Sequence, residues 1–176
     1  MKTDIIAIDN HGAGFERVLD ETGRTAVFKD LNKKQTMALT LCAEEMLSMA
    51  RSITGEVKAS FWIECEEKNF ELHLSTKTVM DKEKRQLLLS ASTSRKNEAA
   101  NTLLGRIRDA FEAAMAADPD RGEQLPMDLL ADLPGPPVND REWDGYERSI
   151  LRKVADQVKI GIRGGTVDMA VCISFD

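Results

Sequence analysis

The chain is poor in the residues that build metal centres and disulfide frameworks, with three cysteines and two histidines among 176 residues. Cys42, Cys65 and Cys172 are far apart and form no C-x-x-C pair, so we expect buried reduced thiols. His11 and His73 cannot form a metal cluster by themselves. There is no apolar run of membrane-spanning length, and the N-terminus lacks the apolar core of a signal peptide. We therefore expect a cytoplasmic protein with no membrane partner.

Positive charge is also in short supply, with 24 lysines and arginines against 30 acidic residues and a net charge of −6. Nucleic acid binding needs a concentrated positive surface, so we expect no direct nucleic acid partner. One stretch is locally positive, and its basic residues are Lys82, Lys84, Arg85, Arg95 and Lys96. These charges would suit a phosphorylated small molecule, or they are solvated loop charges, which is the more common role of such a run.

The most informative feature is a pair of carboxylates, Glu44 and Glu45, inside an otherwise apolar helical segment predicted for residues 33–53. A buried carboxylate is costly unless something pairs with it, so the pair marks a candidate site. Spacings of three and four place Glu45 in the row that should face a sheet, and this row comprises Ala38, Leu41, Cys42, Glu45, Met49, Ala50 and Ile53. Alternatively, the row is rotated slightly and both carboxylates lie at its solvent-exposed edge.

Alternating apolar and polar residues predict two hairpins, over 57–79 and 158–175, the second turning at Gly164-Gly165. A short strand is expected over 3–9, followed by a helix to about residue 30. Asn32 is a plausible N-cap for the helix that follows. This order of elements predicts one domain over 1–176 with an α+β fold. We expect a two-layer sandwich in which a mixed, mostly antiparallel sheet is covered on one face by helices.

All five prolines fall within residues 117–140, which we interpret as an inserted irregular arm. So long an irregular segment is uncommon in a compact domain, so the arm is functional, disordered, or folded as an interaction element. Before it, Ser94, Lys96 and Asn97 lie near the start of a helix predicted for 102–115. A helix N-terminus beside a lysine is a ready anion site, although Ser and Asn there are also ordinary capping residues.

The order of elements resembles the histidine-kinase-like (GHKL) ATPase domain, and within it the small bacterial anti-sigma-factor serine kinases. CAEEMLSMA at 42–50 is similar to the N-box helix of that family, and LHLST at 72–76 stands in the place of its D-x-G-x-G box. STSRKNEAANTLLGRIRDAF at 92–111 stands in the place of the lid and second glycine box. RGGTVDMAVCISF at 163–175 is similar to the closing G-T-x-V-x-L hairpin. The resemblance covers most of the chain except the arm and the helix after it.

The resemblance implies an ATP-binding site whose catalytic base is Glu45, or Glu44 in a shifted frame. In the family an asparagine four residues after the glutamate holds Mg²⁺, but here Met49 or, in the shifted frame, Ser48 takes its place. The resemblance thus implies ATP and Mg²⁺ as cofactors, although the usual magnesium ligand is absent. The remaining cofactor-binding positions that the resemblance implies are Ser75, Ser94, Lys96, Asn97 and Gly105.

Three functions follow from the resemblance and its departures. The first is an ATP-binding, anti-sigma-like serine kinase that regulates a sigma-factor or anti-anti-sigma-like partner, with homodimers expected as in its relatives. A degenerate, non-catalytic interaction module of the same fold is the second. The third is a binder of another small phosphorylated ligand. The first two are both regulatory roles. Fold alone does not decide between them.

Overall fold

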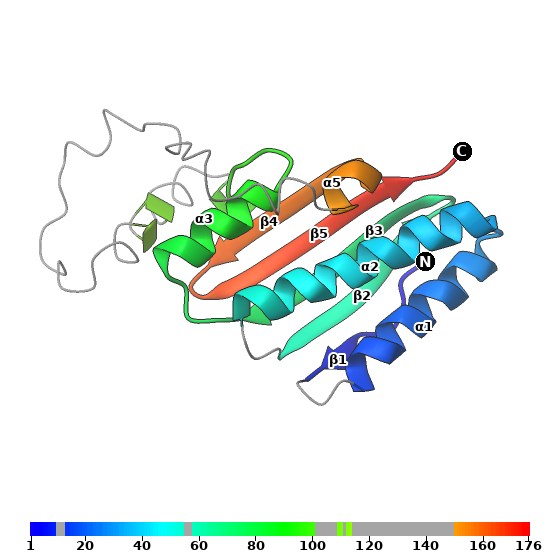
Figure 1. Ribbon diagram of the computed structural model, residues 1–176, viewed down its shortest axis with the longest axis horizontal. Coiled ribbons are helices and arrows are strands. Elements are labelled where there is room, and N and C mark those ends of the chain that lie inside the picture. Colours follow the sequence, from blue (N-terminus) through cyan, green and yellow to red (C-terminus); the bar gives the residue numbers. More distant parts are fainter. Residues whose placement is uncertain (10–12, 55–57, 101–108, 111, 114–149) are drawn as a thin grey trace, which may run out of the picture.

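The computed structural model describes residues 1–9, 13–54, 58–100, 109–110, 112–113 and 150–176 (Figure 1). Five strands form one sheet: β1 (Ile6–Ile8), β2 (Ala59–Glu66), β3 (Asn69–Lys77), β4 (Gln157–Arg163) and β5 (Thr166–Ser174). Their order is β1-β2-β3-β5-β4, and every neighbouring pair is antiparallel. The expected α+β sandwich is confirmed, with a sheet that is antiparallel throughout its described strands.

The helices lie on one face of this sheet, as Figure 1 shows. They are α1 (Ala13–Phe28), α2 (Lys33–Thr54), α3 (Lys82–Ala91), the 3-10 turn η1 (Glu98–Ala100) and α5 (Ile150–Val154). Helices α1 and α2 pack side by side, whereas α3 and α5 both contact β4. None of the helices in the described residues is long and apolar enough to cross a membrane.

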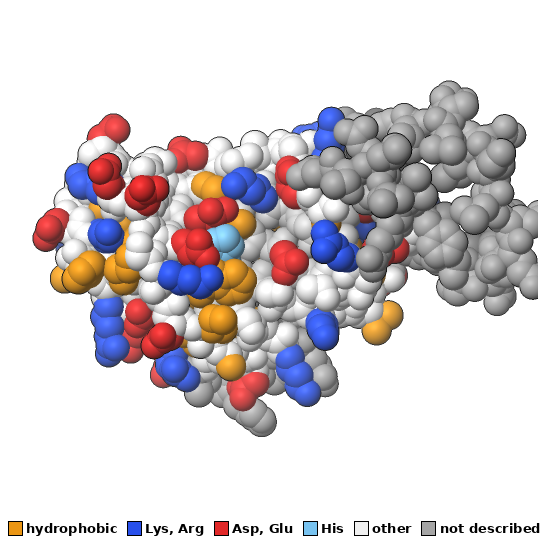
Figure 2. All heavy atoms as spheres, turned by 180° about the vertical axis from the view of Figure 1, so that it is seen from behind, with side chains coloured by type: hydrophobic (Ala, Val, Ile, Leu, Met, Phe, Trp, Pro, Cys, Tyr) orange, Lys and Arg blue, Asp and Glu red, His pale blue; other side chains and the backbone are white. Residues whose placement is uncertain are grey.

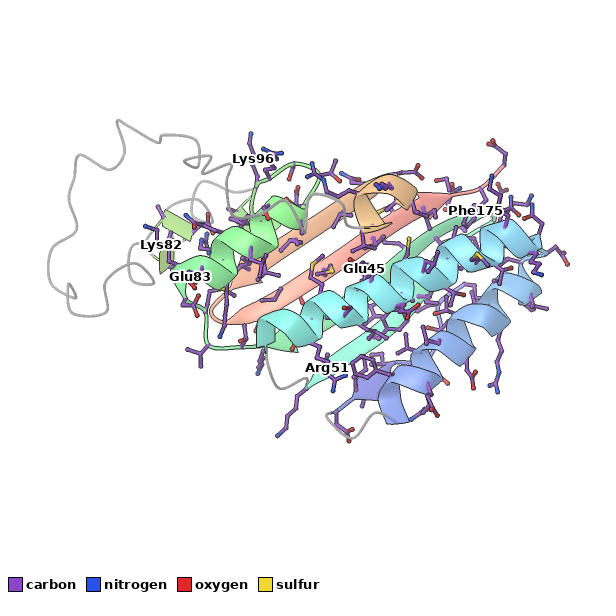
Figure 3. The ribbon with its side chains drawn as sticks, in the orientation of Figure 1. Glu45, Arg51, Lys82, Glu83, Lys96 and Phe175 are labelled. Carbon is purple, nitrogen blue, oxygen red and sulfur yellow. The ribbon has the colours of Figure 1, made fainter. Side chains whose placement is uncertain are left out.

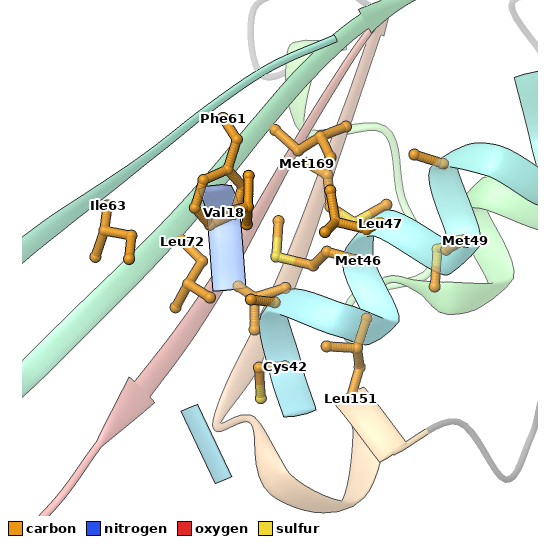
Figure 4. Packing of buried hydrophobic residues seen from close by; sticks show 14 of the residues in the cluster. Val18, Cys42, Met46, Leu47, Met49, Phe61, Ile63, Leu72, Leu151 and Met169 are labelled. Atoms are coloured by element: carbon orange, nitrogen blue, oxygen red, sulfur yellow. The ribbon is translucent and has the colours of Figure 1, made fainter. Parts of the chain in front are cut away.

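Alternation along the strands explains why the helices cover only one face. In β2, Ala59, Phe61, Ile63 and Cys65 are buried, whereas the residues between them are half-buried. The same alternation in β3, β4 and β5 makes a continuous apolar surface, which the helices bury. Figure 4 shows Met46 of α2 among Phe61, Leu72 and Met169 of the strands. Burying this surface supplies most of the free energy of folding.

Local turn chemistry sets the connections between elements. Asn32 and Gln35 form a reciprocal capping box at the start of α2, in which each backbone N–H donates to the other's side-chain oxygen at 3.0 and 2.9 Å. The predicted N-cap is confirmed. At the β4–β5 turn, Gly164 and Gly165 have φ values of 54° and 77°. A Cβ on Gly165 would also lie 2.9 Å from the Thr78 carbonyl oxygen, so glycine is needed there for two reasons.

The second face of the sheet carries no helix among the described residues, and its polar side chains pair with one another across the strands (Figure 2). The Trp62 and His73 rings stack with centroids 4.8 Å apart, and the Lys2 ammonium lies 5.2 Å from the Trp62 ring centroid. Beside this stack, Lys159 Nζ donates to Glu71 Oε1 at 3.2 Å. His73 is therefore half-buried without a covering layer, because its cross-strand neighbours shield it.

His73 makes the stability of the fold depend on pH. Burial lowers the pKa of His73 below its ordinary value of 6.5, although the nearby Glu71 and Glu64 carboxylates act in the opposite direction. The unfolded chain therefore binds this proton more readily than the folded one. As a result, the stability that neutral His73 contributes is present above the unfolded pKa and is lost as pH falls through the folded pKa.

We expect His73→Gln to reduce this pH dependence. Urea unfolding at about pH 7.5 and about pH 5.5 should show a smaller loss of stability in the variant than in the wild type, because the two proteins differ only in this titratable group. Equal losses in the two proteins would show that His73 is not the responsible group.

Candidate functional site

The two carboxylates of α2 point in different directions. Glu44 is exposed and Glu45 is half-buried. The buried row of the described part of α2 is Leu39, Cys42, Ala43, Met46, Leu47, Met49 and Ala50. This row is rotated by about one position from the predicted row, in which Glu45 faced the sheet and Leu41 was central. The placement of Glu45 in the sheet-facing row was therefore wrong: Glu45 lies at the edge of the buried row, and Glu44 lies outside that row.

Glu45 lies on the side of α2 that faces α5, as Figure 3 shows. Burial, together with the negative charges of Asp156 and Glu45, raises the pKa of the neighbouring Cys42 thiol to about 12. A thiol with this pKa stays protonated at neutral pH, so Cys42 is no nucleophile.

The residues four positions after the two carboxylates do not provide a magnesium ligand set. Met49 is only 4% exposed and belongs to the hydrophobic core, where its thioether packs with other apolar groups. Magnesium requires oxygen ligands, which a thioether cannot replace. Ser48 is exposed on the same outer side of α2 as Glu44. Within the described residues, no group of three or more His, Cys, Asp or Glu side chains could hold a metal ion.

Ser75 does not share a face of the sheet with Glu45. It lies on the face without helices, opposite Asp168 of β5, and its hydroxyl donates to Asp168 Oδ1 at 2.6 Å. The prediction that grouped Ser75 with Glu45 in one pocket is therefore wrong. The next residue, Thr76, is the buried polar group on the helix-covered face, and its hydroxyl donates to the Lys58 carbonyl at 3.1 Å. The period-two alternation of β3 could have identified Thr76.

Residues 92–100 follow the outer edge of β4 and are fastened to it at two points. Thr93 N–H donates to the Val158 carbonyl, and the Thr93 hydroxyl accepts from Val158 N–H, both at 2.8 Å. Four residues later, the Asn97 amide donates to the Ile162 carbonyl at 2.9 Å and accepts from Ile162 N–H at 2.7 Å. Thr93 and Asn97 thus bond to β4 where a neighbouring strand otherwise would.

Ser94, Arg95 and Lys96 form an exposed loop between these two fastening points, which we call the 94–96 loop. The Ser94 hydroxyl donates to Glu98 Oε1 at 2.7 Å and accepts from Lys96 N–H at 3.2 Å. Arg95 has a left-handed backbone with φ of 55°, which makes the loop turn sharply. The loop therefore presents two cationic side chains and a hydroxyl from a fixed base. The predicted Gly105 lies outside the described residues.

Sequence reasoning missed a buried polar network behind this loop. Arg85 of α3 is 7% exposed and forms an ion pair with Asp109, and the Asn97 amide also donates to Asp109. Because Arg85 sits in a run of charges, its sequence context predicted a surface residue, and no local pattern could have indicated its partner. Arg85 is thus not available to an anionic ligand, which corrects the interpretation of the basic stretch. Asn97 likewise has a structural role.

The predicted site residues thus fall into separate places. Glu45 and Met49 lie on the α5 side of α2, with Met49 buried, and Glu44 and Ser48 lie on its outer side. The remaining described positions, Ser94, Lys96 and Asn97, belong to the β4 edge, and Ser75 belongs to the opposite face of the sheet. Only the 94–96 loop gathers ligand-competent groups in one described place.

Comparison with known proteins yields neither a matching family model nor a similar curated protein. The fold therefore defines the class as a two-layer α+β sandwich with a five-stranded antiparallel sheet.

The role of Asn97 can be tested by its removal. We expect Asn97→Ala to lower the free energy of unfolding by about 2–4 kcal/mol, because it leaves Ile162 N–H, its carbonyl and Asp109 without this partner. Ser94→Ala, in the exposed loop, should change stability by less than about 0.5 kcal/mol. Urea unfolding followed by circular dichroism measures both variants. An Asn97→Ala protein as stable as the wild type would contradict the structural role.

Proposed function

We propose that the protein is an ATP-binding regulatory protein of the histidine-kinase-like ATPase type, related in role to anti-sigma factors. The observation that carries this proposal is the 94–96 loop, which holds exposed cationic groups at a fixed place beside the helix-covered layer. In the family that the sequence resembles, this segment is the lid over the nucleotide. The order of the described elements is compatible with that assignment.

The loop has the chemistry that phosphate recognition needs. Lys96 supplies a mobile ammonium, Arg95 a guanidinium, and Ser94 a hydroxyl, and all three side chains are exposed. Thr93 and Asn97 hold the base of the loop through four hydrogen bonds to β4. A loop fixed at both ends loses less conformational entropy when a ligand binds, and this favours affinity.

Nucleotide binding on this proposal does not depend on magnesium. Met49 occupies the place of the family's magnesium ligand and is buried in the core. The cationic side chains must therefore neutralise the phosphates, and no metal would assist transfer of the γ-phosphoryl group. In a serine kinase, Glu45 would be the general base. A regulatory role, with a sigma-factor or anti-anti-sigma-like partner and self-association into a homodimer, needs nucleotide binding but no transfer.

The second candidate function is a non-catalytic protein-interaction module that binds no ATP. The burial of Met49 favours it, because a buried methionine cannot serve as the magnesium ligand that phosphoryl transfer uses. Both candidates have the same fold, and they differ in whether the 94–96 loop binds a nucleotide.

A thermal-shift experiment separates the two candidates. We expect ATP and ADP to raise the melting temperature of the full chain, by about 5–10 °C when ATP is present at about 100 times its Kd. The shift should be the same in Mg²⁺ and in EDTA, because the magnesium ligand is absent. AMP and inorganic phosphate, tested in parallel, show whether the ligand is a nucleoside triphosphate or another phosphorylated molecule.

Matched variants locate the binding site. Lys96→Ala should reduce the ATP-induced shift by at least half, whereas Lys34→Ala, an equally exposed lysine on α2, should leave it unchanged. The absence of any shift at millimolar ATP would overturn nucleotide binding and leave the interaction module. Equal losses in both variants would show that the effect is general electrostatics and not a site.

A further inference from the structure

We propose that the corner between α1 and α2 is a docking groove for an acidic amphipathic helix of a partner protein. Among the described residues, Val27, Phe28 and Met37 are large apolar side chains that are 71%, 70% and 58% exposed. All three lie within eleven residues of one helical hairpin. Val27 and Phe28 end α1, and Met37 alone of the three lines the groove described below. An exposed apolar side chain in a groove is typical of a binding surface, whereas an isolated one is ordinary.

A groove of about 400 Å³ lies at this corner, which is where α1 passes into α2 in Figure 1. It is lined by Leu31, Lys33, Thr36, Met37, Thr40 and Leu41. The lining positions on α2 recur at three and four residues, so they form one continuous strip along about two turns of helix. A partner helix that places apolar residues at i, i+3 or i+4 and i+7 matches a strip of this length.

The corner differs in charge from the rest of the chain. Residues 29–34 read KDLNKK, with three lysines and one aspartate, within a protein of net charge −6. Lys33 lines the groove itself, and Lys34 follows it at the exposed start of α2. Asp176 lies beside the start of α2, where its carbonyl oxygen accepts from Gln35 at 3.2 Å and from Lys68 Nζ at 2.9 Å. Basic groups around an apolar groove select a partner with acidic flanks.

The fold does not need these apolar groups for its own packing. Met37 faces away from the sheet, whereas the core side of α2 is formed by other residues such as Leu39 and Met46, which are fully buried. A polar residue at position 37 would cost the folded state little, because its side chain already meets water. The docking groove is formed by residues 31–41 and shares no residue with the 94–96 loop. This inference therefore does not rest on nucleotide binding.

A labelled peptide tests the docking groove. The probe is a fluorescein-labelled helical peptide of about 15 residues with leucines at i, i+3 and i+7, about four glutamates beside them, and alanines at its other positions. Its two controls are the same peptide with lysines for glutamates and the acidic peptide with serines for leucines. Fluorescence anisotropy with the full chain should show the acidic leucine peptide binding at least about tenfold more tightly than either control.

Protein variants tie the binding to the corner. Met37→Ser should weaken binding of the acidic peptide at least about fivefold, and Lys33→Glu should remove the preference over the lysine peptide. The matched controls are Val79→Ser, which changes an apolar residue that is 84% exposed elsewhere, and Lys82→Glu, and both should bind like the wild type.

Three outcomes would overturn the inference. The first is an acidic peptide that fails to bind at about 1 mM, or binds no better than its controls. The second is a Val79→Ser protein that binds as weakly as Met37→Ser, which would mean that the contact is unspecific. The third comes from sedimentation, where a wild-type dimer that Met37→Ser dissociates would show that a second copy covers the groove.

Discussion

The burial of one apolar sheet face is the constraint on which the structure depends. Five antiparallel strands place alternate side chains on that face, and a single layer of helices must cover it. Every residue that packs there is unavailable for chemistry. Met49 illustrates the consequence, because its position on α2 serves the core and cannot also serve a metal ion. Function is therefore confined to the edges of the layer, to the helix surfaces that face solvent and to the uncovered face of the sheet.

The elements that sequence patterns predicted well are those whose signal is local. Period-two alternation identified both hairpins, and Asn32 identified the start of α2. The face of α2 was less accurate, because Ala38, Leu41 and Cys42 are apolar on more than one side of the helix. Apolar periodicity then locates the buried row only to within about one residue, and one residue decides whether Glu45 faces the sheet or its edge.

The parts of the candidate site that sequence could not provide involve long-range pairing. Arg85 meets Asp109 across 24 residues, and Asn97 meets Ile162 across 65. A run of charged residues predicts a solvent-exposed segment even when one of its side chains is buried. The burial of Arg85 could therefore not be recognised from the sequence. Asn97 was selected as a ligand residue for its amide, and the amide is indeed used, but by the backbone of β4. The residue type thus predicted that Asn97 would form hydrogen bonds, but it did not predict which group would be the partner.

Thr93 and Asn97 also have a consequence for how copies of this protein meet one another. An outer strand of a sheet offers unpaired N–H and C=O groups, which are a template for a strand from another molecule. In β4 these groups at Val158 and Ile162 are occupied by the backbone and side chain of Thr93 and by the side chain of Asn97. A foreign strand would have to displace both before it could add to the sheet. The segment that carries the 94–96 loop thus also opposes edge-to-edge aggregation through β4.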